Sequence, residues 1–141
     1  MIAIPQAVIT KIELLTYREV HPTWVVNSRL SSQTFKPTKK DAGKLSIRNS
    51  EKITAEASYK FQTEKLNFKS VGNWAISVGE IIENALQCIE SPKVDEPQDP
   101  SHCHMDFATL TGGQIQTKAD KLVVAARNRG PTYQPPSQNQ A

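Results

Sequence analysis

The sequence lacks long apolar runs, a signal segment and a cysteine framework. No window approaches the roughly 18 uninterrupted apolar residues that a membrane-spanning helix requires. The N-terminal run 1–5 has neither a basic stretch nor a long apolar stretch, so we expect no secretory signal and a cytoplasmic location. The only two cysteines are Cys88 and Cys103. Two thiols make no disulfide framework, so we expect both to be reduced and buried as small hydrophobic side chains.

The sequence also lacks the familiar catalytic and phosphate-binding motifs. It contains no nucleophile elbow, no H-E-x-x-H helix, no EF-hand loop and no kinase motif. Without a C-x-x-C pair, neither a zinc ribbon nor a thioredoxin-type site is supported. The pair Gly112-Gly113 has neither the Walker ending nor a three-glycine fingerprint, so we interpret it as the N-terminal turn of a helix. No reaction type is therefore specified by a motif, and whether the protein is an enzyme stays open.

What is present is enough material for one folded domain. The chain has 141 residues, of which 38% are hydrophobic and 22% are charged. Domains typically have roughly 100–150 residues, and this balance excludes a fully disordered chain. We predict a single domain over residues 1–130. The tail 131–141 is rich in proline and glutamine and has no aliphatic residue except Ala141, so we expect it to be disordered.

The strands are predicted from residue type and from alternation. Residues 7–20 are rich in β-branched and apolar types, which favour one or two strands. Apolar and polar residues alternate over 44–48, 73–79 and 102–107, so each of these is predicted to be a strand. Between the first two strand regions, residues 27–43 are polar and predict a long loop. A loop of this length is usually functional or disordered.

Helical spacing predicts about three helices. Thr54 is a candidate N-cap for the first helix, whose apolar face would hold Ala57 and Phe61. Residues 80–90 have the spacing of a short amphipathic helix. Residues 115–126 carry apolar positions at helical spacing, and a Gly-Pro pair after them is a stop signal. We therefore predict an α+β fold, with a single mixed or antiparallel sheet of about four strands covered by helices on one face.

The net charge of +3 hides an asymmetry along the chain. Residues 29–69 hold ten Lys and Arg against four Asp and Glu, whereas residues 80–106 hold seven acidic residues against one Lys. The basic stretch, followed by the acidic one, could steer an anionic partner to one side of the molecule, or it could be an ordinary solvated surface. We expect a protein partner that binds through the basic stretch and the long loop, with nucleic acid as the other partner that this stretch could bind.

The most informative segment is 102–107, because successive side chains of a strand point to opposite faces. His102, His104 and Asp106 would share one face, while the Cys, Met and Phe between them would pack inward. Two imidazoles and a carboxylate could form half of a zinc or iron site. They could also supply a general acid or base. The third interpretation is the wet face of a one-sided sheet, where polar residues are expected.

Five further residues are candidates for a site. His21 could complete the histidine face if it folds over it, or it could only determine a turn before its proline. Ser46 lies on a predicted strand and could contribute a hydroxyl. Arg29, Ser31 and Ser32 could bind an anion of a cofactor through a guanidinium and hydroxyls. Loop serines are also common in turns for local reasons alone.

Three segments resemble a set of small uncharacterised bacterial proteins. These segments are R-x-V-H-P at 18–22, S-S-x-x-F at 31–35 and K-L-S at 44–46. The resemblance extends roughly over residues 17–130. It implies a bacterial cytosolic protein and no specific activity.

The same segments resemble, more faintly, the ADP-ribosyltransferase-type folds. Those folds present a His or Arg on an early strand and a Ser on a later one, which implies Arg18 or His21 together with Ser46. The late catalytic Glu of that family has no counterpart in a matching motif here, and Glu80 is the candidate for it.

Two functions are therefore expected from the sequence. The first is an accessory or binding protein that works with a partner. The second is a small enzyme on a nucleotide-like or phosphorylated substrate, either ADP-ribosyltransferase-like or a metal-assisted hydrolase. In the second, Arg29 would hold the anion and the pocket would be lined by His21, Ser46, His102, His104 and Asp106.

Overall fold

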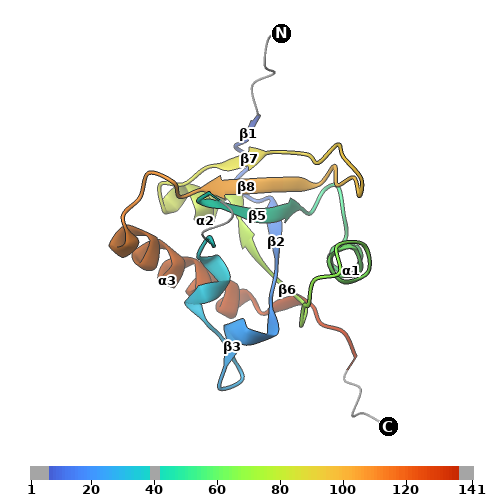
Figure 1. The fold of residues 1–141 in the computed structure, drawn as a ribbon. Helices are drawn as coiled ribbons and strands as arrows, with labels where there is room; N and C mark the ends of the chain where they lie inside the picture. Colours follow the sequence, from blue (N-terminus) through green and yellow to red (C-terminus); the bar gives the residue numbers. More distant parts are fainter. Residues whose placement is uncertain (1–6, 39–41, 137–141) are drawn as a thin grey trace.

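An antiparallel sheet organises the computed structural model, which describes residues 7–38 and 42–136. Within these residues the sheet has seven strands in the order β1-β7-β8-β5-β2-β6-β9, and a separate hairpin pairs β3 with β4 (Figure 1). The sheet strands are β1 (Val8–Ile9), β2 (Leu15–Glu19), β5 (Lys44–Asn49), β6 (Asn73–Ser77), β7 (Cys88–Glu90), β8 (His102–Asp106) and β9 (Pro131–Tyr133). The hairpin strands are β3 (Val25–Val26) and β4 (Arg29–Leu30).

Helices lie on both sides of this sheet. The α-helices of the described chain are α1 (Ala55–Lys60), α2 (Val78–Glu83) and α3 (Gly112–Arg129). Single turns of other helix types are η1 (Pro22–Trp24), η2 (Ser32–Phe35) and η4 (Phe61–Lys65), the last of these π-helical. None of these helices is long and apolar enough to cross a membrane.

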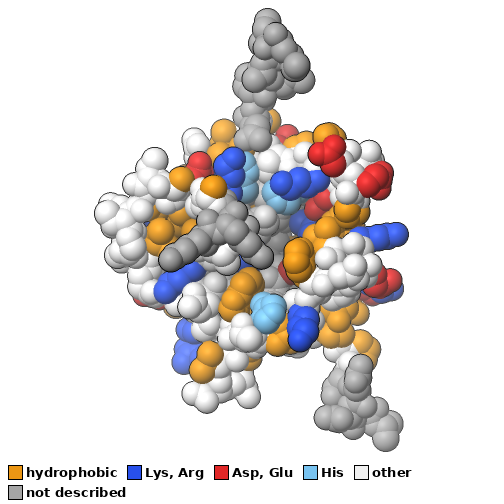
Figure 2. Space-filling view, viewed as in Figure 1, with side chains coloured by type: hydrophobic (Ala, Val, Ile, Leu, Met, Phe, Trp, Pro, Cys, Tyr) orange, Lys and Arg blue, Asp and Glu red, His pale blue; other side chains and the backbone are white. Residues whose placement is uncertain are grey.

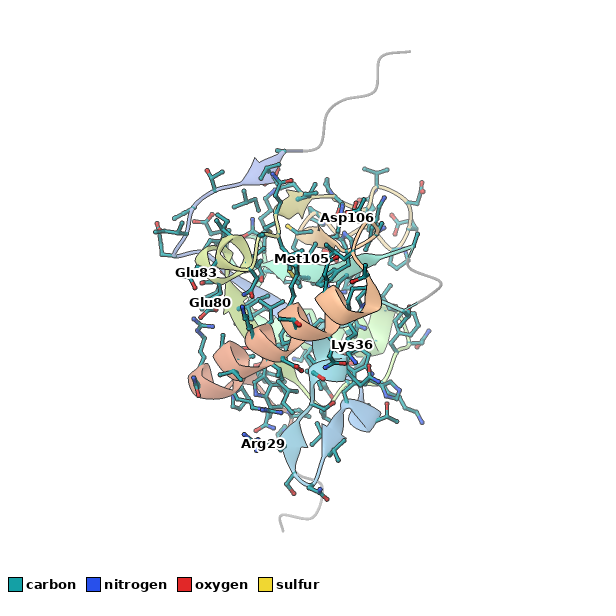
Figure 3. All side chains as sticks on the ribbon, turned by 90° about the vertical axis from the view of Figure 1, so that its left-hand side faces the viewer. Arg29, Lys36, Glu80, Glu83, Met105 and Asp106 are labelled. Atoms are coloured by element: carbon teal, nitrogen blue, oxygen red, sulfur yellow. The ribbon has the colours of Figure 1, made fainter. Side chains whose placement is uncertain are left out.

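The hydrophobic core lies between α3 and one face of the sheet. Leu45 and Ile47 of β5 and Met105 of β8 are buried in it, together with Cys103 and Phe107. Figure 3 shows Met105 on the side of the sheet that α3 covers. The predicted alternation around residue 104 is therefore confirmed, and both cysteines are free and buried as expected.

The longest helix, α3, begins three residues before the predicted apolar pattern and ends at the predicted Gly-Pro stop signal. Thr111 and Gln114 form a capping box, in which each side chain accepts a hydrogen bond from the other residue's backbone N–H. Ala119, Leu122 and Ala126 face the core. Gly130 follows the last turn with a φ of 86°, a conformation that glycine adopts without the strain that a Cβ would cause.

The α+β class is confirmed, but the sheet has more strands than the four that the sequence predicted. β1 and β2 both lie in the region 7–20, where one or two strands were predicted. The strands that were not predicted, β7 and β9, have three residues each, too few to produce an alternating pattern. β9 starts at Pro131 and pairs with β6, so the first residues of the predicted disordered tail are ordered. Residues 137–141 of that tail lie outside the described residues.

Two predicted elements, the long loop and the second helix, have different extents in the structure. The predicted loop 27–43 contains β4 and η2. Both are held by hydrogen bonds between residues close together in the chain, and neither produces a periodic pattern of apolar residues in the sequence. The predicted helix 80–90 begins at Val78, where Ser77 and Glu80 form a capping box, and it ends at Glu83. The chain then returns to the sheet as β7.

The prediction that helices cover one face only is also wrong. Ser58 of α1 contacts Glu19 and Arg48, which lie on the face of β2 and β5 away from the core. Ser58 is buried there, whereas the predicted apolar residue Ala57 is exposed. Figure 1 shows α1 and α3 on opposite sides of β2 and β6. The second sheet face is therefore covered through polar contacts, which leave no hydrophobic periodicity in the sequence.

Substituting Leu122→Ala should lower the free energy of unfolding by about 2–5 kcal/mol, because the cavity left in the core fills only partly. Val124→Ala on the same helix is the matched control, since Val124 is 48% exposed and surface changes typically stay within about 0.5 kcal/mol. Urea denaturation measures both values. Equal losses in the two variants would contradict this placement of the core.

Candidate functional site

A cleft of about 680 Å³ opens on the sheet face away from α3. Its floor is formed by side chains of β2, β5 and β8, including Glu19, Ser46 and His102. One wall is the β7–β8 connection at 92–97, and the other is the segment 61–69 that follows α1. Figure 2 shows a hollow in this face with histidine, lysine and arginine side chains around its rim.

A buried ion pair fastens one wall of the cleft to the floor. The Arg48 Nε lies 2.9 Å from Asp99 Oδ2, and both side chains are less than 10% exposed. The same guanidinium donates hydrogen bonds to Ser58 Oγ at 3.2 Å and to Gln62 Oε1 at 3.0 Å. It also lies over the ring of Phe61, 5.0 Å from the centroid. Arg48 therefore joins both walls of the cleft to β5.

Asp99 is held as a carboxylate by its surroundings. Burial alone would raise its pKa, but hydrogen bonds from Ser101 and from Arg48 outweigh this and lower the pKa. The Ser101 hydroxyl donates to Asp99 Oδ1 at 2.5 Å, and the Ser101 N–H donates to the same oxygen at 3.1 Å. The connection before β8 is thus ordered by polar contacts around a single carboxylate.

Glu19 plays a similar structural part beside the cleft. Its carboxylate accepts hydrogen bonds from Ser58 Oγ at 2.6 Å, Ser70 Oγ at 2.8 Å and Asn73 Nδ2 at 2.8 Å. The side chain is buried, so these three donors replace the water that an ionised carboxylate would otherwise need. Glu19 consequently holds α1 and the start of β6 against β2.

A chain of hydrogen bonds runs from Ser46 to His104. His102 Nε2 lies 3.0 Å from Ser46 Oγ, and His102 Nδ1 lies 2.9 Å from both the carbonyl oxygen and the hydroxyl of Ser91. Ser91 Oγ is 2.8 Å from His104 Nδ1. A carbonyl oxygen can only accept, so His102 Nδ1 carries the ring hydrogen when the imidazole is neutral. Nε2 is then an acceptor, and the Ser46 hydroxyl donates to it.

Both histidines of this chain are held neutral. Burial lowers the pKa of His102 to about 4, and the nearby positive charge of Lys93 acts in the same direction. Burial and the charge of Lys44 lower the pKa of His104 as well. His102 and His104 are only 9% and 4% exposed. The interpretation of this strand face as a wet sheet surface is therefore wrong for both, because the β7–β8 connection covers them.

One end of the cleft is formed by Arg18, His21 and Trp24. The Arg18 guanidinium lies 4.8 Å from the centroid of the Trp24 ring and donates hydrogen bonds to the carbonyl oxygens of Thr34 and Ser46. His21 Nδ1 accepts a hydrogen bond from the Thr23 N–H and so caps η1. His21 therefore determines the turn before Pro22, and it lines the cleft as well.

The structure brings together three of the five predicted catalytic residues, since His21, Ser46 and His102 all line the cleft. His104 does not line the cleft, and the Ser91 hydroxyl links it to His102. Asp106 is exposed at the end of β8, where its carboxylate accepts a hydrogen bond from the Ala108 N–H. Within 7–38 and 42–136, no three His, Cys, Asp or Glu side chains are placed to hold a metal ion together. His102, His104 and Asp106 are thus not arranged as the predicted zinc or iron site.

The predicted anion-binding residues do not line this cleft. Arg29 is exposed on the β3–β4 hairpin, and Figure 3 shows it at the opposite end of the molecule from Asp106. Ser32 Oγ accepts a hydrogen bond from Gln116 Nε2 of α3, 3.2 Å away. The Ser31 hydroxyl is buried without a hydrogen-bond partner among the described residues and makes no cap bond to η2. Ser32 therefore contacts α3, and neither serine lines the cleft.

The basic stretch 29–69 is not a uniformly positive surface. Arg48 is buried against Asp99, and Lys52 and Lys60 form ion pairs with acidic residues. Lys39 and Lys40 lie outside the described residues. Binding of a protein or nucleic-acid partner through this stretch stays a prediction.

Several residues that build the cleft were missed by the sequence analysis. The acidic segment 91–101, for which no helix or strand was predicted, forms a wall and supplies Asp99. Arg48 could have been found, because it lies two residues after Ser46 and must share its face of the strand. No local signal marked Glu19 or Asp99, since their partners lie tens of residues away along the chain.

The candidate Glu of the ADP-ribosyltransferase-type resemblance lies elsewhere. Glu80 caps the N-terminus of α2 and forms an ion pair with Arg129, 2.9 Å away. It is not among the residues that line the cleft. Arg18, His21 and Ser46, the other residues implied by that resemblance, do line it.

Comparisons of the chain with protein-family models, with curated proteins and with solved structures give no match. Both resemblances therefore stay predictions, and the argument for function rests on the cleft itself.

The stability of the protein should fall as the pH drops from 6.5 to about 4. His102 binds its proton less readily in the folded chain than its ordinary pKa of 6.5 implies, so protonation favours the unfolded state over this interval. Above pH 6.5 this contribution is constant. Chemical denaturation at a series of pH values should show a shallower fall for His102→Gln, with the remaining slope due to His104 and the acidic groups. An unchanged slope in the variant would show that His102 is not held neutral.

Removing Asp99 should destabilise the fold strongly, because Asp99→Ala leaves the Arg48 guanidinium buried without its carboxylate. Breaking a buried pair by removing one partner typically costs about 3–5 kcal/mol. The double variant Arg48→Met/Asp99→Leu should recover much of this loss, since it leaves no buried charge. Glu56→Ala, which breaks the exposed Lys60–Glu56 pair, is the control and should change the unfolding free energy very little.

Proposed function

We propose that this protein binds a nucleotide-like ligand, a planar ring joined to an anionic phosphate group, in the cleft over β2, β5 and β8. The observation that carries the proposal is the volume of the cleft together with the types of residue that line it. Small-molecule sites typically occupy about 300–1,000 Å³ and combine apolar and aromatic walls with a few placed polar groups. A cleft of about 680 Å³ with polar side chains on its floor has these properties.

Aromatic side chains in the cleft support the ring part of the proposal. Trp24, Phe61 and Phe68 all line it. Trp24 and Phe61 each have one ring face occupied by a guanidinium, from Arg18 and Arg48. Phe68 is 54% exposed, which is unusual for so large an apolar side chain. An exposed aromatic ring at the rim of a cleft can stack on a planar ligand and be covered by it.

Cationic side chains support the anionic part. Lys69 lines the wall that carries Phe68, and Lys93 lines the opposite wall. Lys93 is near enough to His102 to help lower that imidazole's pKa, so its field reaches the floor. Arg48 is neutralised by Asp99 and acts as a structural cation. The two lysines on opposite walls are therefore the residues we expect to attract a phosphate.

Isothermal titration with AMP, ADP, ATP and NAD should show binding of at least one of them to the full chain. Adenosine alone and inorganic phosphate alone should bind more weakly, because each offers only half of the recognised chemistry. Lys93→Gln should weaken the nucleotide by roughly 3- to 10-fold, as expected for the loss of one charged hydrogen bond. Phe68→Ala should weaken it by a similar factor through lost stacking.

Two matched controls separate the cleft from general surface effects. Lys121→Gln removes an exposed cation from α3, and Val124→Ala trims an exposed apolar side chain of the same helix. Neither change should alter nucleotide binding. The proposal fails if no nucleotide binds, or if the cleft variants and the α3 variants bind it equally well.

A further inference from the structure

We propose that Ser46 is a covalent nucleophile and His102 its general base, acting on a phosphoester of the ligand bound in the cleft. This inference rests on the proposed function only for the class of ligand. The site it assigns is the Ser46–His102 pair, which the structure positions independently of any nucleotide.

The first support is that the Ser46 hydroxyl is accessible from the cleft, while the His102 ring is held in one position. Ser46 is exposed and lines the cleft, so its hydroxyl can meet a bound molecule. His102 is 9% exposed and is held by Ser91 through its second ring nitrogen. A nucleophile within hydrogen-bond reach of a base, with the base oriented by a third group, is the arrangement that activates serine in enzymes.

The second support is the direction of the hydrogen bonds. The Ser91 carbonyl oxygen fixes the ring hydrogen of His102 on Nδ1, so Nε2 faces Ser46 with a lone pair. The Ser46 hydroxyl donates to that lone pair across 3.0 Å. The proton that must leave Ser46 is therefore already directed at the group that would take it.

The reaction balances without any further reagent except water. Ser46 Oγ attacks phosphorus while its proton moves to His102 Nε2, and the bond from phosphorus to the leaving alcohol oxygen breaks. His102 gives its proton to that oxygen, leaving a phosphoserine ester at Ser46. Water then attacks phosphorus, its proton passes to His102, and Ser46 Oγ leaves and takes the proton back.

The charges around the pair suit a phosphorus centre. Lys93 acts on His102 electrostatically, and Arg18 donates to the Ser46 carbonyl oxygen at 3.0 Å, whereas Arg48 is neutralised by Asp99 and adds no free positive charge. Positive charge at this place stabilises the negative charge that spreads over the phosphoryl oxygens during transfer. Ser46 and His102 also border a second cavity of about 50 Å³ beside the cleft. That volume is sufficient for a water molecule.

The pair differs from a catalytic triad in its third member. A backbone carbonyl orients His102, where a triad has a carboxylate that also stabilises the imidazolium. Burial and Lys93 keep the pKa of His102 near 4. His102 is therefore unprotonated across the neutral range but is a weak base, and we expect slow transfer whose rate falls only in acid.

A fluorophosphonate that carries no nucleotide tests the nucleophile directly. Incubation with the wild-type protein should add one phosphonyl group by intact mass, and peptide mapping should place it on Ser46. Because the mapping uses the wild-type chain, the result does not depend on whether a variant folds. Absence of an adduct, or an adduct on another serine such as Ser91, would overturn the assignment.

Variants then separate the nucleophile from its base. Ser46→Ala should abolish the adduct, and His102→Gln should slow its formation by roughly 10²- to 10⁴-fold, the usual range for a general base. Ser32→Ala is the matched control, because Ser32 lies outside the cleft, and it should label at the wild-type rate. Equal labelling rates in wild type and His102→Gln, with both folded by circular dichroism, would contradict the role of His102.

The pH profile gives a readout that a structural hydrogen bond would not move. The labelling rate of folded protein should stay constant from pH 7 to about 5 and reach half its plateau near pH 4. A midpoint near 6.5 would show that another histidine is the base and would overturn the role of His102. Labelling of Ser46 without nucleotide binding would refute the proposed function alone, whereas nucleotide binding without labelling would refute this inference alone.

Discussion

The buried ion pair between Arg48 and Asp99 joins the sheet to the long connection between β7 and β8. Backbone hydrogen bonds from Ser91 to His102 and from Asn49 to Ser101 hold the two ends of the same connection. The segment 91–101 contains three prolines and no named strand or helix of its own, so its position depends on such tertiary contacts. The Coulomb attraction of a buried pair is largely offset by the cost of removing both ions from water. Its main effect is therefore to select one arrangement: the guanidinium is satisfied only when Asp99, Ser58 and Gln62 all surround it.

Once that connection is in place, the chemistry of the sheet face changes. His102 and His104 would be ordinary solvated histidines on an open sheet. Covered by the connection, they lose contact with water and become neutral. The covering segment also supplies Ser91, whose carbonyl fixes the tautomer of His102 and thereby the direction of the Ser46 hydrogen bond. The covering segment, which this ion pair helps to hold in place, thus shapes the cleft and favours the neutral form of the histidines on its floor.

The structure confirms the predicted helices and strands whose formation depends on residues close together in the chain. The helix over α3 follows from apolar spacing and from the Gly-Pro pair directly after its last turn. The strand at His102–Asp106 follows from strict alternation, which correctly separated its buried thiol and thioether from its imidazoles. Short strands such as β7 gave no such signal, because three residues cannot display a period. The polar packing of α1 also left no apolar stripe to detect.

By itself, the sequence determined the α+β class, the core face of β5 and β8, and the choice of His21, Ser46 and His102 as residues worth testing. Only the tertiary structure decided that these three share one cleft and that Arg29, Ser31, Ser32 and Asp106 lie outside it. Alternation and capping act between neighbours in the chain, so they can be recognised in a string of letters. The contacts that make the cleft join residues 51 and 56 positions apart, Arg48 to Asp99 and Ser46 to His102. Such contacts exist only after the strands have paired and the chain entropy of bringing them together has been overcome.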